Sequence, residues 1–257
     1  MGHYYLLLSL PPLSLKEPPA ISFAELKESL HLNLSARDEK HVASLFEEID
    51  LYNIKAFWAG LPLDPRGNED LTHLEESLLV GDVPLFFADF LQKYPLPEER
   101  ILHFAEAIAA FYREKEEKER GILQEWYDFE RKRNLLLAAL RAKKLERNLA
   151  DVFKDEEASD PTVAFLLAQK DSFDLFLPVG WEELKVIFVE NQREPKKMHR
   201  AILEYQLEKI EELEEKSSPF SLDQVFLYVL KFLIVQTWAV AQGTQGKEVV
   251  EKIVDGT

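Results

Sequence analysis

The feature that most constrains the fold is the stretch after Pro97, which runs to Ala150 without a proline and with a single glycine, Gly121. Proline breaks helices and glycine weakens them, so a stretch with so few of either favours helix. At a rise of about 1.5 Å per residue, it allows one helix of roughly 80 Å or two helices broken near Gly121. Either arrangement makes long helices the main element of the chain.

The rest of the sequence has the same character. Ser22 and Ser35 are each followed three residues later by an acidic residue, which is typical of a helix N-terminus. A second long helix is expected over residues 195–216, and an apolar helix over residues 222–241. We therefore predict an all-α fold, a bundle of long helices with an irregular N-terminal part. Residues 4–10 are expected to form a short strand or extended segment.

We expect two portions that together make one compact unit. Residues 1–95 are predicted to form an N-terminal lobe of extended segment and short helices, and residues 96–257 the long-helix bundle. Residues 113–120 are all charged. They are interpreted as a solvated helix section with pairs such as Glu114–Lys118, and the alternative is that the helix leaves the bundle there and projects.

The charge balance argues against two classes of partner. The chain has 47 acidic and 31 basic side chains, for a formal net charge of −16. Binding to nucleic acid or to anionic lipid depends on Lys and Arg, so neither is expected. The chain has no cysteine, which excludes disulfides, thiolate zinc sites and cysteine nucleophiles. We expect a cytoplasmic protein.

The apolar segment 222–241 is long enough to be considered as a membrane span. It contains four polar or charged side chains, Asp223, Gln224, Lys231 and Gln236. Such residues are costly in a bilayer, so a buried helix is the better interpretation.

Motifs for catalysis are weak or absent. Gly243 to Lys247 resembles a phosphate-binding loop only superficially, because the glycine spacing, the Ser or Thr after Lys and a preceding strand are missing. The six histidines are scattered, and no His-Glu-x-x-His motif occurs. We expect no enzyme, no cofactor and no metal site, although a triad assembled only in space is not excluded by sequence.

Two segments resemble each other. Residues 50–58 and residues 128–144 each place an asparagine, Asn53 or Asn134, directly before an aliphatic residue, with acidic residues upstream. Basic residues follow, among them Lys55 in the first segment. Asparagine is mildly unfavourable inside a helix, so its repetition suggests a buried amide that bonds a neighbouring helix. The alternative is coincidence.

A basic cluster stands out against the acidic background. Its members are Arg131, Arg133, Arg141, Lys143, Lys144 and Arg147. One interpretation is a solvated face that pairs with acidic side chains of the same chain. The other is a docking site for an acidic partner surface.

These segments also carry a resemblance to a known group of proteins. It involves Tyr4 to Leu6 with Ser9 to Pro11, residues 50–58, Trp126 to Lys144, and Pro219 to Phe226 before Trp238. The chain resembles a family of unknown function found in bacterial V-type ATPase operons. More weakly, it is similar to the C (or d) subunit of V-type and archaeal-type rotary ATPases, a funnel of three similar helical units. A third repeat would lie in residues 228–238, where the asparagine is missing.

The resemblance implies a function. The chain would be a non-catalytic accessory or central-stalk subunit of a V-type rotary ATPase, coupling the shaft to the membrane rotor ring for ion transport. Its partners would be the shaft subunits and that ring, with catalysis in other subunits. It would lie in the cytoplasm, at the inner face of the membrane, through the complex. The alternatives are an assembly factor for the same ATPase and an unrelated helical enzyme.

Overall fold

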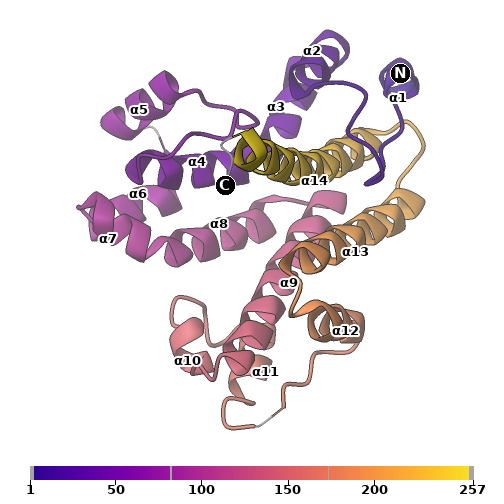
Figure 1. The fold of residues 1–257 in the computed structure, drawn as a ribbon. Coiled ribbons are helices and arrows are strands. Elements are labelled where there is room, and N and C mark those ends of the chain that lie inside the picture. The colour runs from indigo at the N-terminus through magenta and orange to yellow at the C-terminus, as the bar shows by residue number, and fades with distance from the viewer. Residues whose placement is uncertain (1–2, 82, 173, 255–257) are drawn as a thin grey trace. The chain divides into compact units, whose positions relative to one another are not determined.

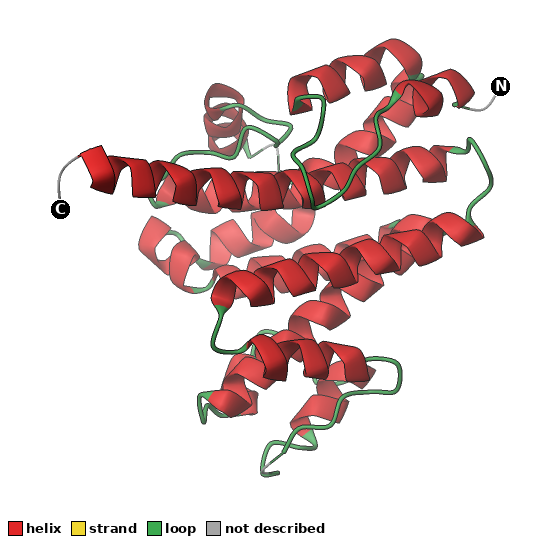
Figure 2. Cartoon of the chain, turned by 45° about the vertical axis from the view of Figure 1, so that its right-hand side comes forward, coloured by secondary structure: helices red, strands yellow, loops and turns green. Residues whose placement is uncertain are grey.

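The computed structural model describes residues 3–81, 83–172 and 174–254, and the side chains of residue 85 and of residues 244–254 lie outside this description. Every regular element in these ranges is a helix, and they contain no strand (Figure 2). The predicted all-α fold class is thereby confirmed. The chain divides into two compact units, residues 1–45 with 191–257 and residues 46–190.

The first unit, unit 1, is built from the two ends of the chain. Its helices are α1 (Tyr4–Ser9), α2 (Phe23–Asn33), α3 (Ala36–Ala43), α13 (Pro195–Lys216) and α14 (Leu222–Val254) (Figure 1). A short 3-10 turn, η1 (Ser44–Phe46), leads out of it. The second unit, unit 2, is continuous in sequence. It contains α4 (Glu47–Trp58), α5 (Leu71–Val80), α6 (Leu85–Lys93), α7 (Pro97–Leu102), α8 (Phe104–Lys118), α9 (Ile122–Lys144), α10 (Leu149–Val152), α11 (Pro161–Leu167) and α12 (Glu182–Asn191).

Helix α14 forms the core of unit 1. It packs along α13 and also contacts α3, and Figure 1 shows α13 and α14 side by side. Leu222–Gly243 has a mean hydropathy of 1.6 and is the described helix that is long and apolar enough to cross a membrane. Half of that segment is buried, including Val225, Leu227 and Phe232. This burial fits the predicted buried helix, since a core helix meets the same test of length and composition.

The helix signals near the N-terminus have mixed outcomes. Ser22 and Glu25 form the predicted capping box, in which Ser22 N donates to Glu25 Oε2 at 2.7 Å and Glu25 N donates to Ser22 Oγ at 3.2 Å. The expectation of an extended segment at residues 4–10 was wrong, because Tyr4–Ser9 is helix α1. No strand lies in the described chain to pair with it, whereas a helix bonds its own backbone while burying Leu6, which is 1% exposed.

The proline-free stretch forms separate helices rather than one. Gly121 has a φ of 62° and stands between α8 and α9, so the chain breaks where a left-handed residue is cheapest. The charged run at the end of α8 is only partly solvated. Glu114 and Lys118 form the predicted pair, but Lys115 is 5% exposed and its Nζ lies 2.8 Å from Glu47 Oε2.

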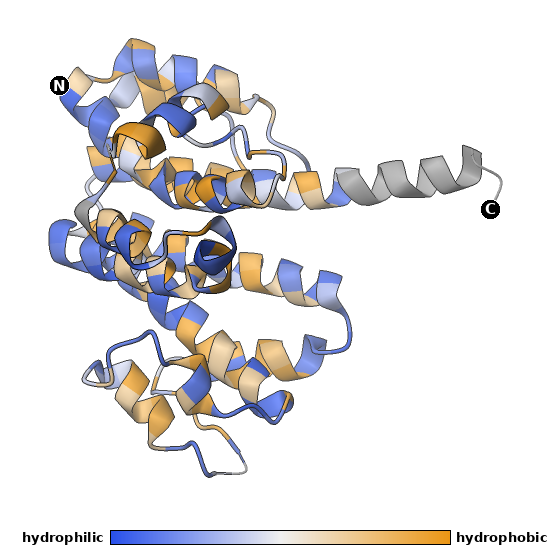
Figure 3. Cartoon of the chain, turned by 90° about the vertical axis from the view of Figure 1, so that its left-hand side faces the viewer, coloured by the Kyte–Doolittle hydropathy of each residue, from blue (hydrophilic) through white to orange (hydrophobic). Residues whose placement is uncertain are grey.

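Hydrophilic and hydrophobic residues are interspersed along the helices of both units (Figure 3). The division into units differs from the predicted portions 1–95 and 96–257. Residues 1–45 cluster with residues 191–257 because α3 contacts α14, a pairing of distant segments that local sequence patterns do not reveal.

Candidate functional site

The candidate site residues from the sequence, Asn53 and Lys55 on α4 and those of the basic helix α9, lie in unit 2. Helices α8 and α9 pack on each other, and α4 packs on α8. On α9, positions 131, 134, 135, 138 and 141 have the spacing of residues that share one helix face. The arrangement places both asparagine-containing segments at one side of this unit.

Asn53 holds a loop. It is 2% exposed, donates from Nδ2 to Asp64 O at 2.9 Å, and accepts at Oδ1 from Asp64 N at 2.7 Å. Asp50, one turn earlier, accepts at Oδ1 from Asn68 N at 2.6 Å. A side chain at Gly67 would collide with the ends of the Asp50 and Asn53 side chains and displace the groups that hold this loop. The amide is buried, as expected, but it bonds a loop rather than a neighbouring helix.

Asn134 has a different environment. It is exposed, and its Nδ2 donates to the Tyr112 hydroxyl on α8 at 3.3 Å. The Tyr112 hydroxyl in turn donates to Glu48 Oε1 at 2.9 Å. The amide therefore reaches a neighbouring helix, as expected, but without being buried. The two asparagines have unlike roles, and the interpretation of both as one buried-amide motif was wrong.

Arg133 belongs to the same polar chain. Its Nη2 donates to Glu130 Oε2 at 2.6 Å and to Asn134 Oδ1 at 3.1 Å. Burial, reinforced by the nearby Glu130 carboxylate, raises the pKa of Glu48 to about 7. Glu48 is therefore protonated in a large fraction of molecules at neutral pH.

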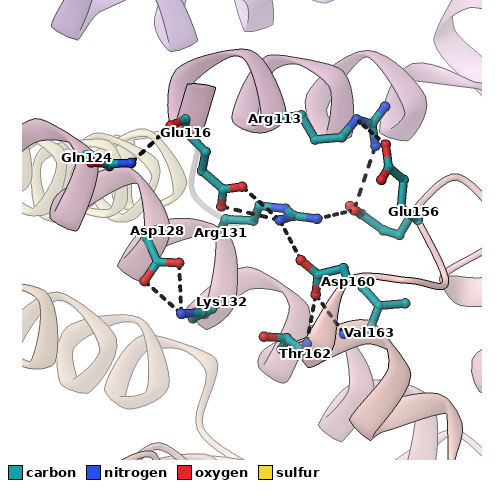
Figure 4. A network of polar contacts seen from close by, with 11 residues as sticks. Arg113, Glu116, Gln124, Asp128, Arg131, Lys132, Glu156, Asp160, Thr162 and Val163 are labelled. Atoms are coloured by element: carbon teal, nitrogen blue, oxygen red, sulfur yellow. Dashed lines mark hydrogen bonds and ion pairs between the residues drawn. The ribbon is translucent and has the colours of Figure 1, made fainter. Parts of the chain in front are cut away.

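Arg131 is the centre of an ion-pair network. The residue is 6% exposed, and Figure 4 shows its guanidinium between three carboxylates. Nη1 lies 3.0 Å from Glu116 Oε2 and 2.9 Å from Asp160 Oδ2, and Nη2 lies 3.0 Å from Glu156 Oε2. Burial alone would lower the pKa of Arg131, but hydrogen bonding to Glu156 and the charges of the three acids raise it.

The network ties three parts of unit 2 together. Glu116 is on α8, while Asp160 caps α11 by accepting from Thr162 N at 2.8 Å and Val163 N at 2.9 Å. Glu156 also lies near Arg113, with 4.0 Å between Oε2 and Nη1. Arg131 and Arg133 thus pair with acids of the same chain, the first of the two interpretations of the basic cluster.

Lys143 is likewise occupied within the chain. Its Nζ donates to the backbone oxygens of Gln169, Lys170 and Ser172 at 2.8, 2.8 and 2.6 Å. These carbonyls follow the end of α11, where orphan acceptors are common. Lys144 is exposed and has a contact within the chain.

Arg141 and Lys55 differ from Arg131 and Arg133 in lacking a carboxylate partner within the described chain. Arg141 is exposed, and Lys55 is half-buried with its Nζ 5.0 Å from the centre of the Phe104 ring. Over the ranges that the structure describes, neither has an ion pair with a carboxylate. Both line a groove of about 460 Å³ on unit 2.

The groove, here called the α4–α9 groove, is formed by α4, α8, α9, α10 and the residues after α10. Its lining comprises Tyr52, Lys55, Phe104, Ala105, Ile108, Tyr112, Arg131, Asn134, Leu135, Ala138, Arg141, Val152, Phe153, Asp155 and Glu156. None of these is His, Ser or Thr, and the described residues contain no group of three or more His, Asp or Glu placed to hold a metal. The lining provides apolar contact and charge rather than a nucleophile beside a base.

Sequence reasoning identified the α4 and α9 side of the groove but missed the rest. Tyr52 lies within the segment 50–58, but Phe104, Tyr112 and residues 151–160 were not singled out. The acidic excess of that segment after a basic helix was an available signal for the Arg131 pairing. The aromatic lining carried no such signal, because core helices have the same pattern.

The comparisons with known proteins show one family and three relatives. A family described as "Protein of unknown function (DUF2764)" matches residues 1–257. A Chlamydia muridarum protein is 28% identical over 264 residues, covering 100% of this chain and 99% of the relative. A Chlamydia trachomatis serovar D protein is 29% identical over 263 residues, 98% and 97% of the two chains, and a Chlamydia pneumoniae protein is 30% identical over 219 residues, 82% of each. All three are described as uncharacterized proteins. No solved structure matches the chain.

Proposed function

The chain belongs to the DUF2764 family, and we propose that it is a non-catalytic helical adaptor of a V-type rotary ATPase, which couples the central shaft to the membrane rotor ring. ATP chemistry and ion translocation belong to partner subunits in this proposal. The chain itself needs no cofactor for this role. Its place is the cytoplasmic face of the membrane, held there through the complex.

One observation carries the proposal. Two of the segments that resemble the rotary ATPase proteins, residues 50–58 and Trp126 to Lys144, line the same groove. Tyr52 and Lys55 come from the first segment, and Asn134, Ala138 and Arg141 come from the second. Residues that are far apart in sequence and share one open surface are suited to a common binding task.

The way in which unit 2 is held together supports a mechanical role. An adaptor that transmits torque has to keep its helices fixed to one another under load. The Arg131 network joins α8, α9 and the segment leading into α11 through charge-assisted hydrogen bonds with defined geometry. Such a network restrains rotation and sliding of helices more than apolar contacts alone.

The assembly-factor alternative has the same helical requirements, and stoichiometry separates it from the proposal. A stalk subunit is present once in every complex, whereas an assembly factor leaves when the complex is complete. The helical-enzyme alternative requires a pocket with convergent reactive groups. The α4–α9 groove is open and is lined by three cations, two acids, an asparagine, two tyrosines and apolar side chains, which favours binding over catalysis.

The experiment is quantitative mass spectrometry of the rotary ATPase, purified from native membranes in mild detergent through a tag on another subunit. We expect one copy of this chain per complex, retained through gel filtration. A fraction far below one copy favours the assembly factor. Complete absence from an otherwise intact and active ATPase contradicts the proposal.

A further inference from the structure

The α4–α9 groove combines cationic and apolar side chains in its lining. The protein has a formal net charge of −16, so a cation in an apolar groove without a carboxylate partner is available to an acidic ligand. Arg131 and Arg133 are paired within the chain, with carboxylates at 3.0 Å or less. Lys55 and Arg141 are not, since no ion pair of either is present in the part of the chain that the structure describes.

Two acids in or beside the groove are already bonded to other groups of the chain. Glu156 is engaged by Arg131 at 3.0 Å, and Glu48, behind Tyr112, accepts the tyrosine hydroxyl at 2.9 Å. Asp155 lines the groove and is the acid there without such an engagement among the described residues. A ligand that fits therefore carries negative charge toward Lys55 and Arg141 and a polar or basic group toward Asp155.

The apolar part of the lining selects among negatively charged ligands. Phe104, Leu135 and Phe153 are buried and form its floor, whereas Ala105, Ile108 and Val152 are at least partly exposed. Tyr52 is 48% exposed beside Phe104, with 5.9 Å between the ring centres. A free inorganic anion would leave this surface wet. A protein segment that places carboxylates beside apolar side chains would cover it while pairing both cations.

We propose that the α4–α9 groove docks a segment of another protein that presents carboxylates, to Lys55 and Arg141, next to apolar side chains that enter between Phe104 and Ala138. The Arg131 network fixes one wall of the groove before the partner arrives. Preformed walls reduce the entropy lost on binding. The inference rests on the proposed function for the identity of the partner, an ATPase subunit, and on the groove alone for its chemistry.

A peptide assay on the full chain tests this chemistry. The probe is a fluorescein-labelled amphipathic helical peptide with Leu along one face and Glu on both flanks of that face. The control probes replace either all Glu by Gln or all Leu by Ser. Fluorescence anisotropy is measured for the wild-type chain and for K55Q, R141Q, the double variant K55Q/R141Q and A138F, which narrows the groove without removing a charge.

The matched control is R147Q, which removes an exposed positive charge just beyond α9 and outside the groove lining. We expect each single Gln variant to weaken binding of the Glu peptide roughly threefold to tenfold, and R147Q less than about twofold. Both control probes should bind more weakly than the Glu peptide, and A138F should weaken binding at unchanged charge. Circular dichroism melting verifies that each variant is folded.

Three results overturn the inference. The Glu peptide fails to bind the wild-type chain, or it binds K55Q/R141Q as well as wild type, or inorganic phosphate displaces it while removal of Leu has no effect, which would identify a small-anion site. The purified ATPase separates this inference from the proposed function. If K55Q/R141Q is still present at one copy per complex, the groove is not the docking site and the function stands. If the wild-type chain is absent from the complex while the peptide binds through both cations, the function fails and the groove stands.

Discussion

Helix α14 buries apolar side chains, whereas α9 buries an arginine and a glutamate beside its leucines. Among the described residues, the buried polar or charged side chains are Asn53, Lys115, Glu130, Arg131, Thr162 and Gln206. Only Gln206 belongs to unit 1. Unit 1 is thus a conventional apolar core, and unit 2 contains buried charge that is satisfied by specific partners.

This difference between the units indicates which of them is expected to supply stability and which the binding surface. An apolar core gains free energy from area and tolerates small rearrangements. A buried ion-pair network gains little net stability but fixes geometry, and it becomes costly when one partner is lost. The groove with the unpaired cations lies in unit 2, beside that network.

The largest loss of stability is expected from truncating a large side chain in the core of unit 1. Phe232 is fully buried on α14, with its ring 6.4 Å from that of Phe23. Replacing Phe232 with Ala removes a large apolar side chain and leaves a cavity, so F232A should lower the free energy of unfolding by about 3–5 kcal/mol. Urea denaturation measures the change. A loss below about 1 kcal/mol would mean that α14 is not the core of this unit.

The second-largest loss of stability is expected from breaking the Arg131 network of unit 2. R131M removes the guanidinium and leaves Glu116, Glu156 and Asp160, which are 26%, 13% and 19% exposed, without their cation. We expect a loss of about 3 kcal/mol, because uncompensated acids remain in a partly dry site.

The matched variant in unit 1 is K231M, which removes a single part-buried ion pair with Glu214 at 2.9 Å, the two side chains being 18% and 30% exposed. One acid rather than three loses its cation, so the loss should be smaller, about 1 kcal/mol. Hydrogen exchange should show faster opening of α8 and α9 in R131M and little change in α13 and α14. Equal losses for both variants would remove the distinction between the units.

A pH effect is expected in unit 2 from Glu48. Its pKa is raised in the folded chain to about 7, first by burial and then by the Glu130 carboxylate. A raised carboxyl pKa favours folding at low pH, so this contribution is present below the unfolded pKa of about 4.5 and is lost as pH rises toward 7. E48Q cannot ionise, and it should be more stable than wild type at pH 8 by roughly 1–3 kcal/mol, with the difference vanishing near pH 4.

Denaturation of wild type and E48Q across this pH range measures the difference directly. Other carboxyl groups titrate in both proteins and cancel in the comparison. A difference that stays constant with pH, or that grows toward low pH, would contradict the burial of Glu48.

A smaller effect is expected at the loop held by Asn53. N53A removes two hydrogen bonds to the backbone of Asp64, at 2.9 and 2.7 Å. The free energy of unfolding should fall by about 1–2 kcal/mol, since two part-buried backbone groups lose their partner. Exchange of the Asp64 amide hydrogen should accelerate selectively, and unchanged exchange would exclude the clamp.

The smallest effect is expected at the cap of α2 in unit 1. S22A removes the side chain that accepts from Glu25 N at 3.2 Å and should cost about 1 kcal/mol. S22D keeps an acceptor at this position and should retain most of the stability. Thermal melting followed by circular dichroism distinguishes the two variants, and an equal loss in both would show that the cap contributes nothing.

Local signals predicted much of the fold. Pro195 and the Ser217 break gave the bounds of α13, and the Ser22 capping box gave the start of α2, because these features act within one helical turn. The N-terminal helix was missed, since Tyr4 to Leu8 is apolar without a period and its state depends on packing of Leu6. The division into units was missed for the same reason, as α3 meets α14 across more than a hundred residues.

Part of the candidate site could also be predicted from local sequence signals. Lys55, Asn134 and Arg141 stood out from the sequence because charge and amide are unusual within apolar helices. The sequence did not show which basic residues pair within the chain. Arg131 and Arg141 are alike in sequence context and differ only in whether Glu156 and Asp160 fold back to them. Pairing of this kind is a property of tertiary structure.

The most direct test of the central claim is cryo-electron microscopy of the rotary ATPase isolated from native membranes. The account predicts one copy of this chain between the central shaft and the rotor ring, in contact with both, with a carboxylate-bearing segment of a neighbouring subunit in the α4–α9 groove. A complex whose shaft meets the ring without this chain, or in which the chain lies on the stationary periphery, would contradict it.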